Sequence, residues 1–381
     1  MMKMNKWTMA LAAAGVVSLS SVAQAQEAAS GAEALAASTT LSGYVSTSYT
    51  MNESDSRGAN PVPANSLPQG YFRSDQDLNK FSTDVFSLTL ASAQGAGEYA
   101  TGYTVQLWAG DAANEIGTND GDNANVGGTV ELMQANIDLR LPLGTGLNLK
   151  VGTFGTTVGA ETYDYNSNAF FTRSFAFNAE PTHHTGVLAS YQVNDSLSVA
   201  VGAANDGSAA TNSSNQGGKT LLGSVSYTLP DSLGPLGGAD LYYGTVQGVQ
   251  AAGSDDETDY HYFSASVPLP VEGLSYMLAW DVVEKDAGVG VNDGDTNLVG
   301  HYLSYAVNDK LTANLRYETG NINTNNTAGF GGNADGVESL TIGLDYALWE
   351  NVTSRIEWRE DSADGGITDQ EVVAVNLVYS F

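Results

Sequence analysis

The chain ends on Val373-Ala374-Val375-Asn376-Leu377-Val378-Tyr379-Ser380-Phe381, and this stretch decides the fold. Large apolar side chains at every second position alternate with mostly small or polar ones, which indicates a β-strand with one apolar face. Chain ends fray unless neighbouring structure holds them. A strand that runs to a terminal aromatic residue therefore predicts that the last strand is paired within a sheet.

The same alternation recurs along most of the chain. Segments of ~10 residues are separated by clusters rich in Gly, Asn and Asp. We expect sixteen strands, at 39–51, 81–91, 99–110, 130–142, 147–154, 184–193, 196–205, 219–229, 237–248, 259–269, 273–285, 296–307, 310–320, 336–347, 351–360 and 370–381.

The connections between these segments alternate in length. Short turns, such as 194–195 and 308–309, follow every second strand, and long polar loops, such as 52–80 and 155–183, follow the others. Short turns at one end and long loops at the other are typical of a transmembrane antiparallel up-and-down β-barrel, with the turns periplasmic and the loops extracellular. Ten residues at ~3.3 Å each, tilted by ~40°, cover the ~25 Å apolar band of such barrels. The sequence thus predicts an all-β barrel over 39–381, whose last strand closes against the first.

The N-terminus fits export. Lys3 and Lys6 precede an apolar run from Met9 to Leu19, and Ala23-Gln24-Ala25 follows it. This order is typical of a secretory signal peptide, which we place at 1–25. Residues 26–38 carry no strand pattern and are expected to be a flexible segment.

Composition excludes several classes of protein. The chain has 43 acidic and 14 basic residues, a formal charge of −29, and no cysteine. Nucleic acid is not an expected partner, because phosphate binding needs positive charge. Thiolate chemistry and Cys-ligated metals are absent. The adjacent His183 and His184 would point to opposite faces of a strand, so we expect no metal site and no cofactor.

Strand alternation assigns a face to each charged residue. Met133 and Ile137 are expected to face lipid, where Arg or Lys would cost ~2–4 kcal/mol at mid-bilayer. A barrel of this size encloses water. The predicted pore-lining residues are Asp138, Arg140, Lys150, Arg316, Glu318, Arg355, Glu357 and Arg359.

Around the third long loop the sequence is similar to a known family. The stretches that carry the resemblance are Val151-Gly152-Thr153-Phe154-Gly155, Asn168-Ala169-Phe170-Phe171-Thr172-Arg173-Ser174 and Glu180-Pro181-Thr182-His183-His184. They resemble the putative β-barrel porin-2 family (OmpL-like), most closely over 130–205. The resemblance implies a bacterial outer-membrane porin for passive diffusion of small hydrophilic solutes and ions. It brings no catalytic residues, so we expect no enzyme.

In many sixteen-stranded porins the third external loop folds inward and narrows the channel. Here that loop is 155–183, and it carries Glu161, Asp164, Arg173 and Glu180. Acidic loop residues opposite a basic wall would set up a transverse field that influences ion preference. We therefore take 155–183 as a candidate constriction loop. The alternative is that these charges only solvate the wall or form scattered ion pairs.

Two other functions stay open at this point. A non-conducting surface or adhesion barrel would use its long loops, and a lipid-modifying barrel enzyme would use Ser and His on one strand face, although no spacing marks a nucleophile. The expected partners are outer-membrane lipid and lipopolysaccharide, small hydrophilic solutes, and the barrel assembly machinery through Phe381. A homotrimer is compatible with the size of the barrel.

Overall fold

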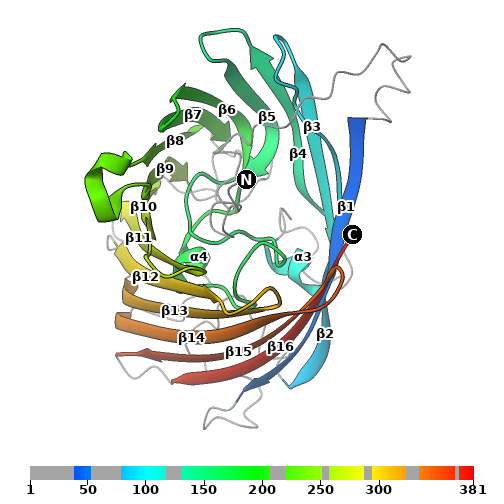
Figure 1. Cartoon of the computed structure of the whole chain (residues 1–381), viewed down its shortest axis with the longest axis vertical. Coiled ribbons are helices and arrows are strands. Elements are labelled where there is room, and N and C mark those ends of the chain that lie inside the picture. The colour runs from blue at the N-terminus through cyan, green and yellow to red at the C-terminus, as the bar shows by residue number, and fades with distance from the viewer. Residues whose placement is uncertain are drawn as a thin grey trace.

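The computed structural model describes residues 38–52, 79–116, 130–205, 219–250, 257–286, 294–322, 334–364 and 369–381. Within them the strands form one closed barrel, in which each strand pairs antiparallel with its sequence neighbours and β1 pairs with β16 (Figure 1). The predicted signal peptide and residues 26–37 lie outside the described part of the chain.

The predicted barrel of sixteen strands is confirmed, and the strand ends differ from the prediction by a few residues. In the structure the connection 230–236 contains a short 3-10 helix, η2 (Asp231–Leu236), rather than a simple turn. The strands are β1 (Thr39–Asn52), β2 (Lys80–Ser92), β3 (Thr101–Ala109), β4 (Val130–Leu141), β5 (Leu147–Gly155), β6 (His183–Asn194), β7 (Leu197–Asn205), β8 (Lys219–Thr228), β9 (Asp240–Gln250), β10 (Glu257–Pro268), β11 (Leu274–Asp286), β12 (Gly294–Ala306), β13 (Leu311–Ile322), β14 (Ala334–Trp349), β15 (Val352–Ala363) and β16 (Gln370–Ser380).

The last strand closes the barrel as its sequence predicts. The Phe381 amide donates to the Gly43 carbonyl at 2.9 Å, and the Gly43 amide donates back to the Phe381 carbonyl at 3.0 Å. The Phe381 ring stacks on Phe86 with 6.5 Å between centroids. A Cβ on Gly43 would lie 2.2 Å from the Ser87 carbonyl oxygen, so the strands approach this closely only because residue 43 is glycine.

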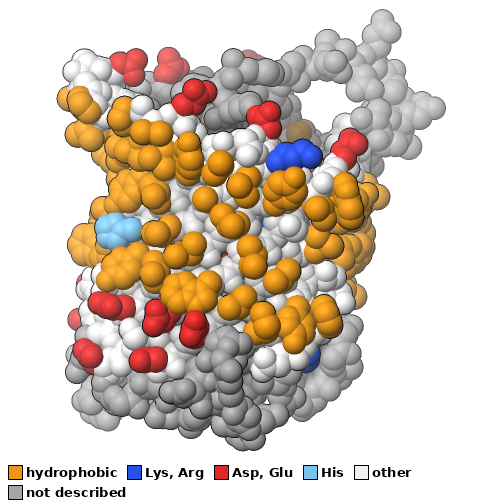
Figure 2. Space-filling view, turned by 60° about the horizontal axis from the view of Figure 1, so that its bottom comes forward, with side chains coloured by type: hydrophobic (Ala, Val, Ile, Leu, Met, Phe, Trp, Pro, Cys, Tyr) orange, Lys and Arg blue, Asp and Glu red, His pale blue; other side chains and the backbone are white. Residues whose placement is uncertain are grey.

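The outer face of the barrel is apolar around its middle. Figure 2 shows hydrophobic side chains across this band, with acidic side chains towards both ends. Tyr227, Tyr305, Tyr346 and Tyr379, which stand just before short turns or the chain end, are exposed on this outer face. Tyrosine suits the boundary between apolar and aqueous surroundings, so these rings are placed as an interfacial girdle requires.

One predicted face is wrong. Met133 is fully buried inside the barrel, whereas Leu132 is 41% exposed on the outer face. The pairing of β3 with β4 shifts between Gln106 and Leu107, and this bulge adds one residue to β4. Because side chains alternate with a period of two, one extra residue exchanges the faces beyond it. Ile137, on the other side of the bulge, faces outward as predicted.

Two short helices lie inside the ring of strands in Figure 1, α3 (Asp111–Ile116) and α4 (Phe175–Ala179). No helix among the described residues is long and apolar enough to cross a membrane. The helix α4 belongs to the connection between β5 and β6, residues 156–182, which holds the candidate site.

Candidate functional site

Residues 155–183, which are the connection between β5 and β6 with one residue of each strand, lie within the barrel and contact widely separated strands. Thr157 accepts a hydrogen bond from Tyr242 of β9 at 2.6 Å, and Asp164 accepts one from Tyr44 of β1 at 3.0 Å. Glu161 contacts Arg316 of β13. We call residues 155–183 the internal loop.

An ion pair holds the internal loop to β13. Arg316 Nη1 lies 2.6 Å from Glu161 Oε1, and both side chains are almost fully buried. The same nitrogen donates to the Thr172 carbonyl at 2.9 Å, and the guanidinium lies over the Phe170 ring, 4.9 Å from its centroid. The pair is therefore surrounded by partners that offset the cost of removing its charges from water.

Two wall carboxylates bind backbone amides of the internal loop. Glu357 of β15 accepts from the Phe171 amide at 2.8 Å and from the Thr172 hydroxyl. Glu318 of β13 accepts from the Phe175 amide at 2.9 Å, at the first turn of α4. The first amides of a helix have no partner within the helix, so Glu318 satisfies a donor that would otherwise be left buried and unpaired.

Two wall arginines bind carbonyls of the internal loop. Arg355 donates to the Tyr165 carbonyl at 2.6 Å and to the Asn168 carbonyl at 2.8 Å. Arg359 donates to the Arg173 carbonyl and pairs through Nε with Asp361 at 2.8 Å. These wall arginines are thus covered by the internal loop, with their donors directed at its backbone.

Arg173 organises the internal loop from within. Its guanidinium donates to the Tyr163 carbonyl at 2.8 Å and to the Phe171 carbonyl at 3.1 Å. It also lies over the Tyr165 ring, 4.5 Å from the centroid. The side chain is 1% exposed, so its charge is used inside the loop rather than in a water-filled passage.

Asp164 joins the internal loop to β1 and β3. Its carboxylate accepts from Tyr44 of β1 and, at 2.9 Å, from Gln106 of β3. Burial raises the pKa of Asp164 to about 6, while the hydrogen bonds from Tyr44 and Gln106 and the charge of Arg173 oppose the rise. Asp164 therefore changes charge within the mildly acidic range.

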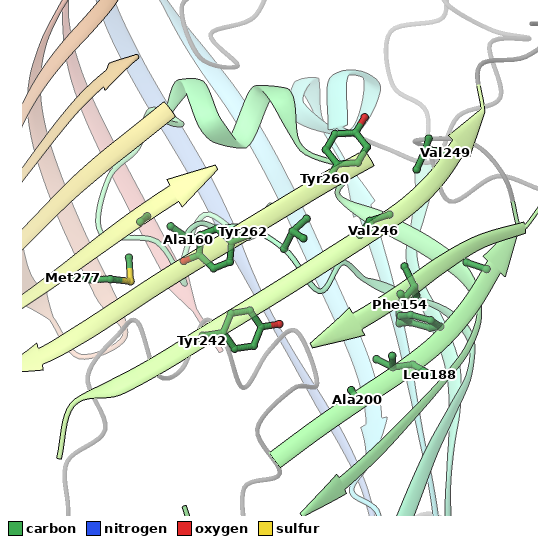
Figure 3. Packing of buried hydrophobic residues seen from close by; sticks show 14 of the residues in the cluster. Phe154, Ala160, Leu188, Ala200, Tyr242, Val246, Val249, Tyr260, Tyr262 and Met277 are labelled. Carbon is green, nitrogen blue, oxygen red and sulfur yellow. The ribbon is translucent and has the colours of Figure 1, made fainter. Parts of the chain in front are cut away.

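Apolar packing complements these polar contacts on the side of β6 to β12. Val158, Ala160 and Phe170 of the internal loop share one buried cluster with wall residues. Figure 3 shows the wall members Tyr242, Val246 and Tyr262 projecting from β9 and β10. Gly244 of β9 allows the approach, because a Cβ there would lie 2.1 Å from the Thr157 carbonyl oxygen.

The remaining predicted wall charges lie apart from the internal loop. Lys150 of β5 pairs with Asp138 of β4 at 2.9 Å, and both side chains are partly exposed, by 19% and 22%. Arg140 donates to Asn148 at 3.0 Å and to the Thr145 carbonyl at 2.7 Å, next to the short turn between β4 and β5. These three side chains are the predicted pore-lining residues that keep access to water.

Glu180 is the fourth charged residue expected on the internal loop. Its carboxyl group contacts Asp281 of β11, and the Glu161 and Glu318 charges are close enough to act on it. Burial and the neighbouring Asp281 raise the pKa of Glu180 well above its usual range. The internal loop therefore contains a carboxyl group that favours its protonated form.

Sequence reasoning missed the aromatic and amide contacts of the internal loop. Tyr44, Gln106 and Tyr242 were not singled out, although each faces inward and binds the loop. A large aromatic residue on the otherwise small and polar face of a strand, such as Tyr44 beside Ser46 and Ser48, is the signal that could have found them.

Among the described residues, no group of three or more His, Asp or Glu side chains is arranged to hold a metal ion.

Comparison with known families and structures agrees with this architecture. The profile of the family described as "Putative beta-barrel porin-2, OmpL-like" matches residues 38–381. No curated protein is detectably similar in sequence.

Three solved structures share the fold. An anion-selective porin from Comamonas acidovorans is 14% identical, with a TM-score of 0.62 and coverage of 90% of this chain and 99% of that one. The outer-membrane channel DcaP of Acinetobacter baumannii is 12% identical, with a TM-score of 0.59 and coverage of 90% and 97%. OmpT of Vibrio cholerae, in a trimer form, is 12% identical, with a TM-score of 0.58 and coverage of 90% and 99%.

Proposed function

Because the chain belongs to the putative β-barrel porin-2 family, we propose that it forms a water-filled channel for passive diffusion of small hydrophilic solutes and ions. Its place is the bacterial outer membrane, as for its family and the solved relatives. In this proposal the internal loop is the constriction.

The proposal rests mainly on the attachment of the internal loop to β13 and β15 on the inner wall. One buried ion pair and several hydrogen bonds hold it there, and they come from Arg316, Glu318, Arg355, Glu357 and Arg359. Such a loop would narrow the passage without depending on a mobile lid. Asp138, Arg140 and Lys150 would then line the vestibule near the short turns.

Conductance of the refolded protein in planar bilayers tests this proposal. Stepwise current increments are expected as single barrels insert. Arg355→Ala removes two hydrogen bonds to the internal loop and should raise the single-channel conductance or its noise. Lys310→Ala, which changes an exposed turn residue by the same charge, should leave both unchanged. Barrels that insert without carrying current would contradict the channel.

The remaining partners belong to the same proposal. The OmpT structure described as a trimer supports a homotrimer for this chain as well. Recognition of Phe381 by the barrel assembly machinery and contact with lipopolysaccharide fit an outer-membrane barrel. Neither the family nor the fold brings a catalytic site, so we propose no enzymatic activity. The adhesion alternative would act through loops such as 53–78, which lie outside the described residues.

A further inference from the structure

A pocket lies between the two ends of the internal loop and the inner face of β4 and β9. Its lining is mainly apolar and includes the rings of Tyr163, Phe177 and Tyr242. Three carboxyl groups, those of Glu161, Asp164 and Glu180, also line it. None of its lining residues is Lys, Arg or His.

The tyrosine rings of this pocket are fixed by their own contacts. Tyr242 donates to the Thr157 carbonyl at 2.6 Å. Tyr163 donates to Gln106 at 2.8 Å, and its ring stacks on His183 with 4.4 Å between centroids. A ligand would therefore meet aromatic walls that need no ordering on binding, and preorganisation of this kind favours affinity.

The three carboxyl groups differ in whether a cation or hydrogen-bond donors contact them. Glu161 is paired with Arg316 and accepts from the Ser174 amide at 3.0 Å, and Asp164 accepts from Tyr44 and Gln106. Glu180, in contrast, meets the carboxyl group of Asp281.

The contact between Glu180 and Asp281 lacks hydrogen-bond donors. Asp281 is 2% exposed, and both Glu180 Oε1 and Asp281 Oδ2 are buried without a hydrogen-bond donor among the described residues. Two carboxylates in contact cannot both be ionised unless a cation offsets their charge, so this pair needs either a proton or a cation.

The surroundings of the pair add negative charge. Arg316, the cation of β13, is already engaged by Glu161 and Glu318. Glu180 and Asp281 also interact electrostatically with other titratable groups, which are Glu161, Glu318, Tyr260 and Tyr262. No neighbouring side chain among these supplies a free positive charge.

We propose that this pocket binds a small organic cation, an ammonium group with apolar substituents, beside Glu180, whose carboxyl group then gives up the proton that it shares with Asp281. The aromatic rings would attract the cation through their faces, and the apolar lining would accept its substituents. The proton leaves to the solvent, so the charge of the site is balanced with or without ligand. The inference rests on the proposed channel, since the ligand is a solute that enters the barrel.

The acid–base chemistry of Glu180 gives this exchange a signature. Burial and Asp281 raise the pKa of Glu180 well above its usual range, so the empty pocket holds a proton. Binding of a cation should release that proton. Affinity should consequently rise with pH over the range in which the empty pocket is protonated.

Calorimetry on the refolded full-length barrel in detergent micelles tests the proposal, with tetramethylammonium as the probe. We expect saturable binding, proton release seen as a dependence of the heat on the buffer's ionisation enthalpy, and tighter binding at pH 8 than at pH 6. The neutral isostere tert-butanol should bind at least tenfold more weakly. Equal binding of the two probes, or no binding of tetramethylammonium, would overturn the proposal.

Variants separate the site from non-specific attraction to a negatively charged barrel. Glu180→Gln and Tyr242→Leu should each weaken tetramethylammonium binding at least tenfold, and Tyr242→Phe should recover most of what Tyr242→Leu loses. Glu272→Gln removes the same charge from an exposed turn and should bind as the unmodified protein does. If Glu180→Gln does not fold, Tyr242→Leu and the comparison of the two probes still test whether the cation binds in this pocket.

Conductance distinguishes failure of this inference from failure of the channel. A barrel that conducts potassium chloride but does not bind tetramethylammonium overturns the pocket and leaves the channel standing. A barrel that binds the probe with the expected proton release but carries no current supports the pocket and overturns the channel.

Discussion

Arg316 Nη1 and Glu161 Oε1 lie 2.6 Å apart, although the two residues are 155 positions apart in the sequence. The contact ties the internal loop to β13 on the inner wall of the barrel. Because both side chains are almost inaccessible to water, neither charge can be solvated if the other is lost. The position of the internal loop therefore depends strongly on this ion pair.

The two partners of this pair should not contribute independently to the stability of the protein. Arg316→Met leaves the buried Glu161 carboxylate without its cation, and such changes cost about 3–5 kcal/mol. Glu161→Gln leaves Arg316 with Glu318 as its remaining ionised partner and should cost less. The double variant should cost clearly less than the sum of the two. The measurement is reversible urea unfolding in detergent micelles, followed by tryptophan fluorescence. Strict additivity would mean that the two side chains do not act as a pair.

The ion preference of the channel should depend on Lys150. Its ammonium group is partly exposed, whereas the arginines of β13 and β15 are covered by the internal loop. Lys150→Gln leaves the Asp138 carboxylate unpaired on the inner face. We expect the cation-to-anion permeability ratio to rise, by about twofold at low salt, where charge interactions are least screened.

Reversal potentials in a potassium chloride gradient measure this ratio. Lys310→Gln is the matched control, because it removes one positive charge from an exposed turn. An equal shift in the two variants would assign the effect to overall charge rather than to the inner face.

Closure of the barrel should depend on Asp84. This carboxylate of β2 is fully buried and accepts hydrogen bonds from Ser46 at 2.8 Å, Ser48 at 2.6 Å and Asn376 at 3.3 Å, so it joins β2, β1 and β16. Asp84→Ala would leave the buried Ser46 and Ser48 hydroxyls without this acceptor, at a cost of about 1–3 kcal/mol each. We expect a total loss of about 3 kcal/mol and a lower temperature at which the barrel unfolds in SDS.

Electrophoresis of heated and unheated samples follows this loss, because folded barrels resist SDS. Asp84→Asn keeps an acceptor and should lose less. Asp195→Ala, in an exposed turn, should stay within about 0.5 kcal/mol of the unmodified protein. Unchanged heat resistance in Asp84→Ala would show that the seam does not need this carboxylate.

The barrel can be predicted from the sequence because the patterns that define its strands and turns are local. Alternation with a period of two, turn residues and the cost of charge in lipid place Arg316, Arg355 and Arg359 on the inner face without knowledge of their partners. The bulge beside Met133 breaks that rule, because an extra residue between two strands leaves no mark in the composition.

The partners within the barrel are the part that sequence alone does not predict. Alternation says that Arg355 faces inward, but not whether it meets water or the carbonyls of Tyr165 and Asn168. The contact of Glu180 with Asp281 is of the same kind. Such contacts depend on how residues 155–183 cross the interior, and the contacts of a loop are set by tertiary packing.

The attachment of the internal loop to β1 and β3 should weaken as the pH rises from about 4 to 6. Burial raises the pKa of Asp164 from its ordinary value of 3.8 to about 6. The folded protein therefore binds more protons than the unfolded chain in this window, and its stability falls as the pH rises through it. A shift of this size corresponds to about 2–3 kcal/mol.

The test compares the unmodified protein with Asp164→Asn by urea unfolding at several pH values. Asparagine offers Tyr44 and Gln106 an oxygen of similar geometry but does not titrate, so the difference in stability between the two proteins isolates Asp164. This difference should move in favour of Asp164→Asn by about 2–3 kcal/mol between pH 4 and pH 7. Because other carboxyl groups titrate equally in both proteins, a difference that stays constant over this range would show that burial does not perturb Asp164.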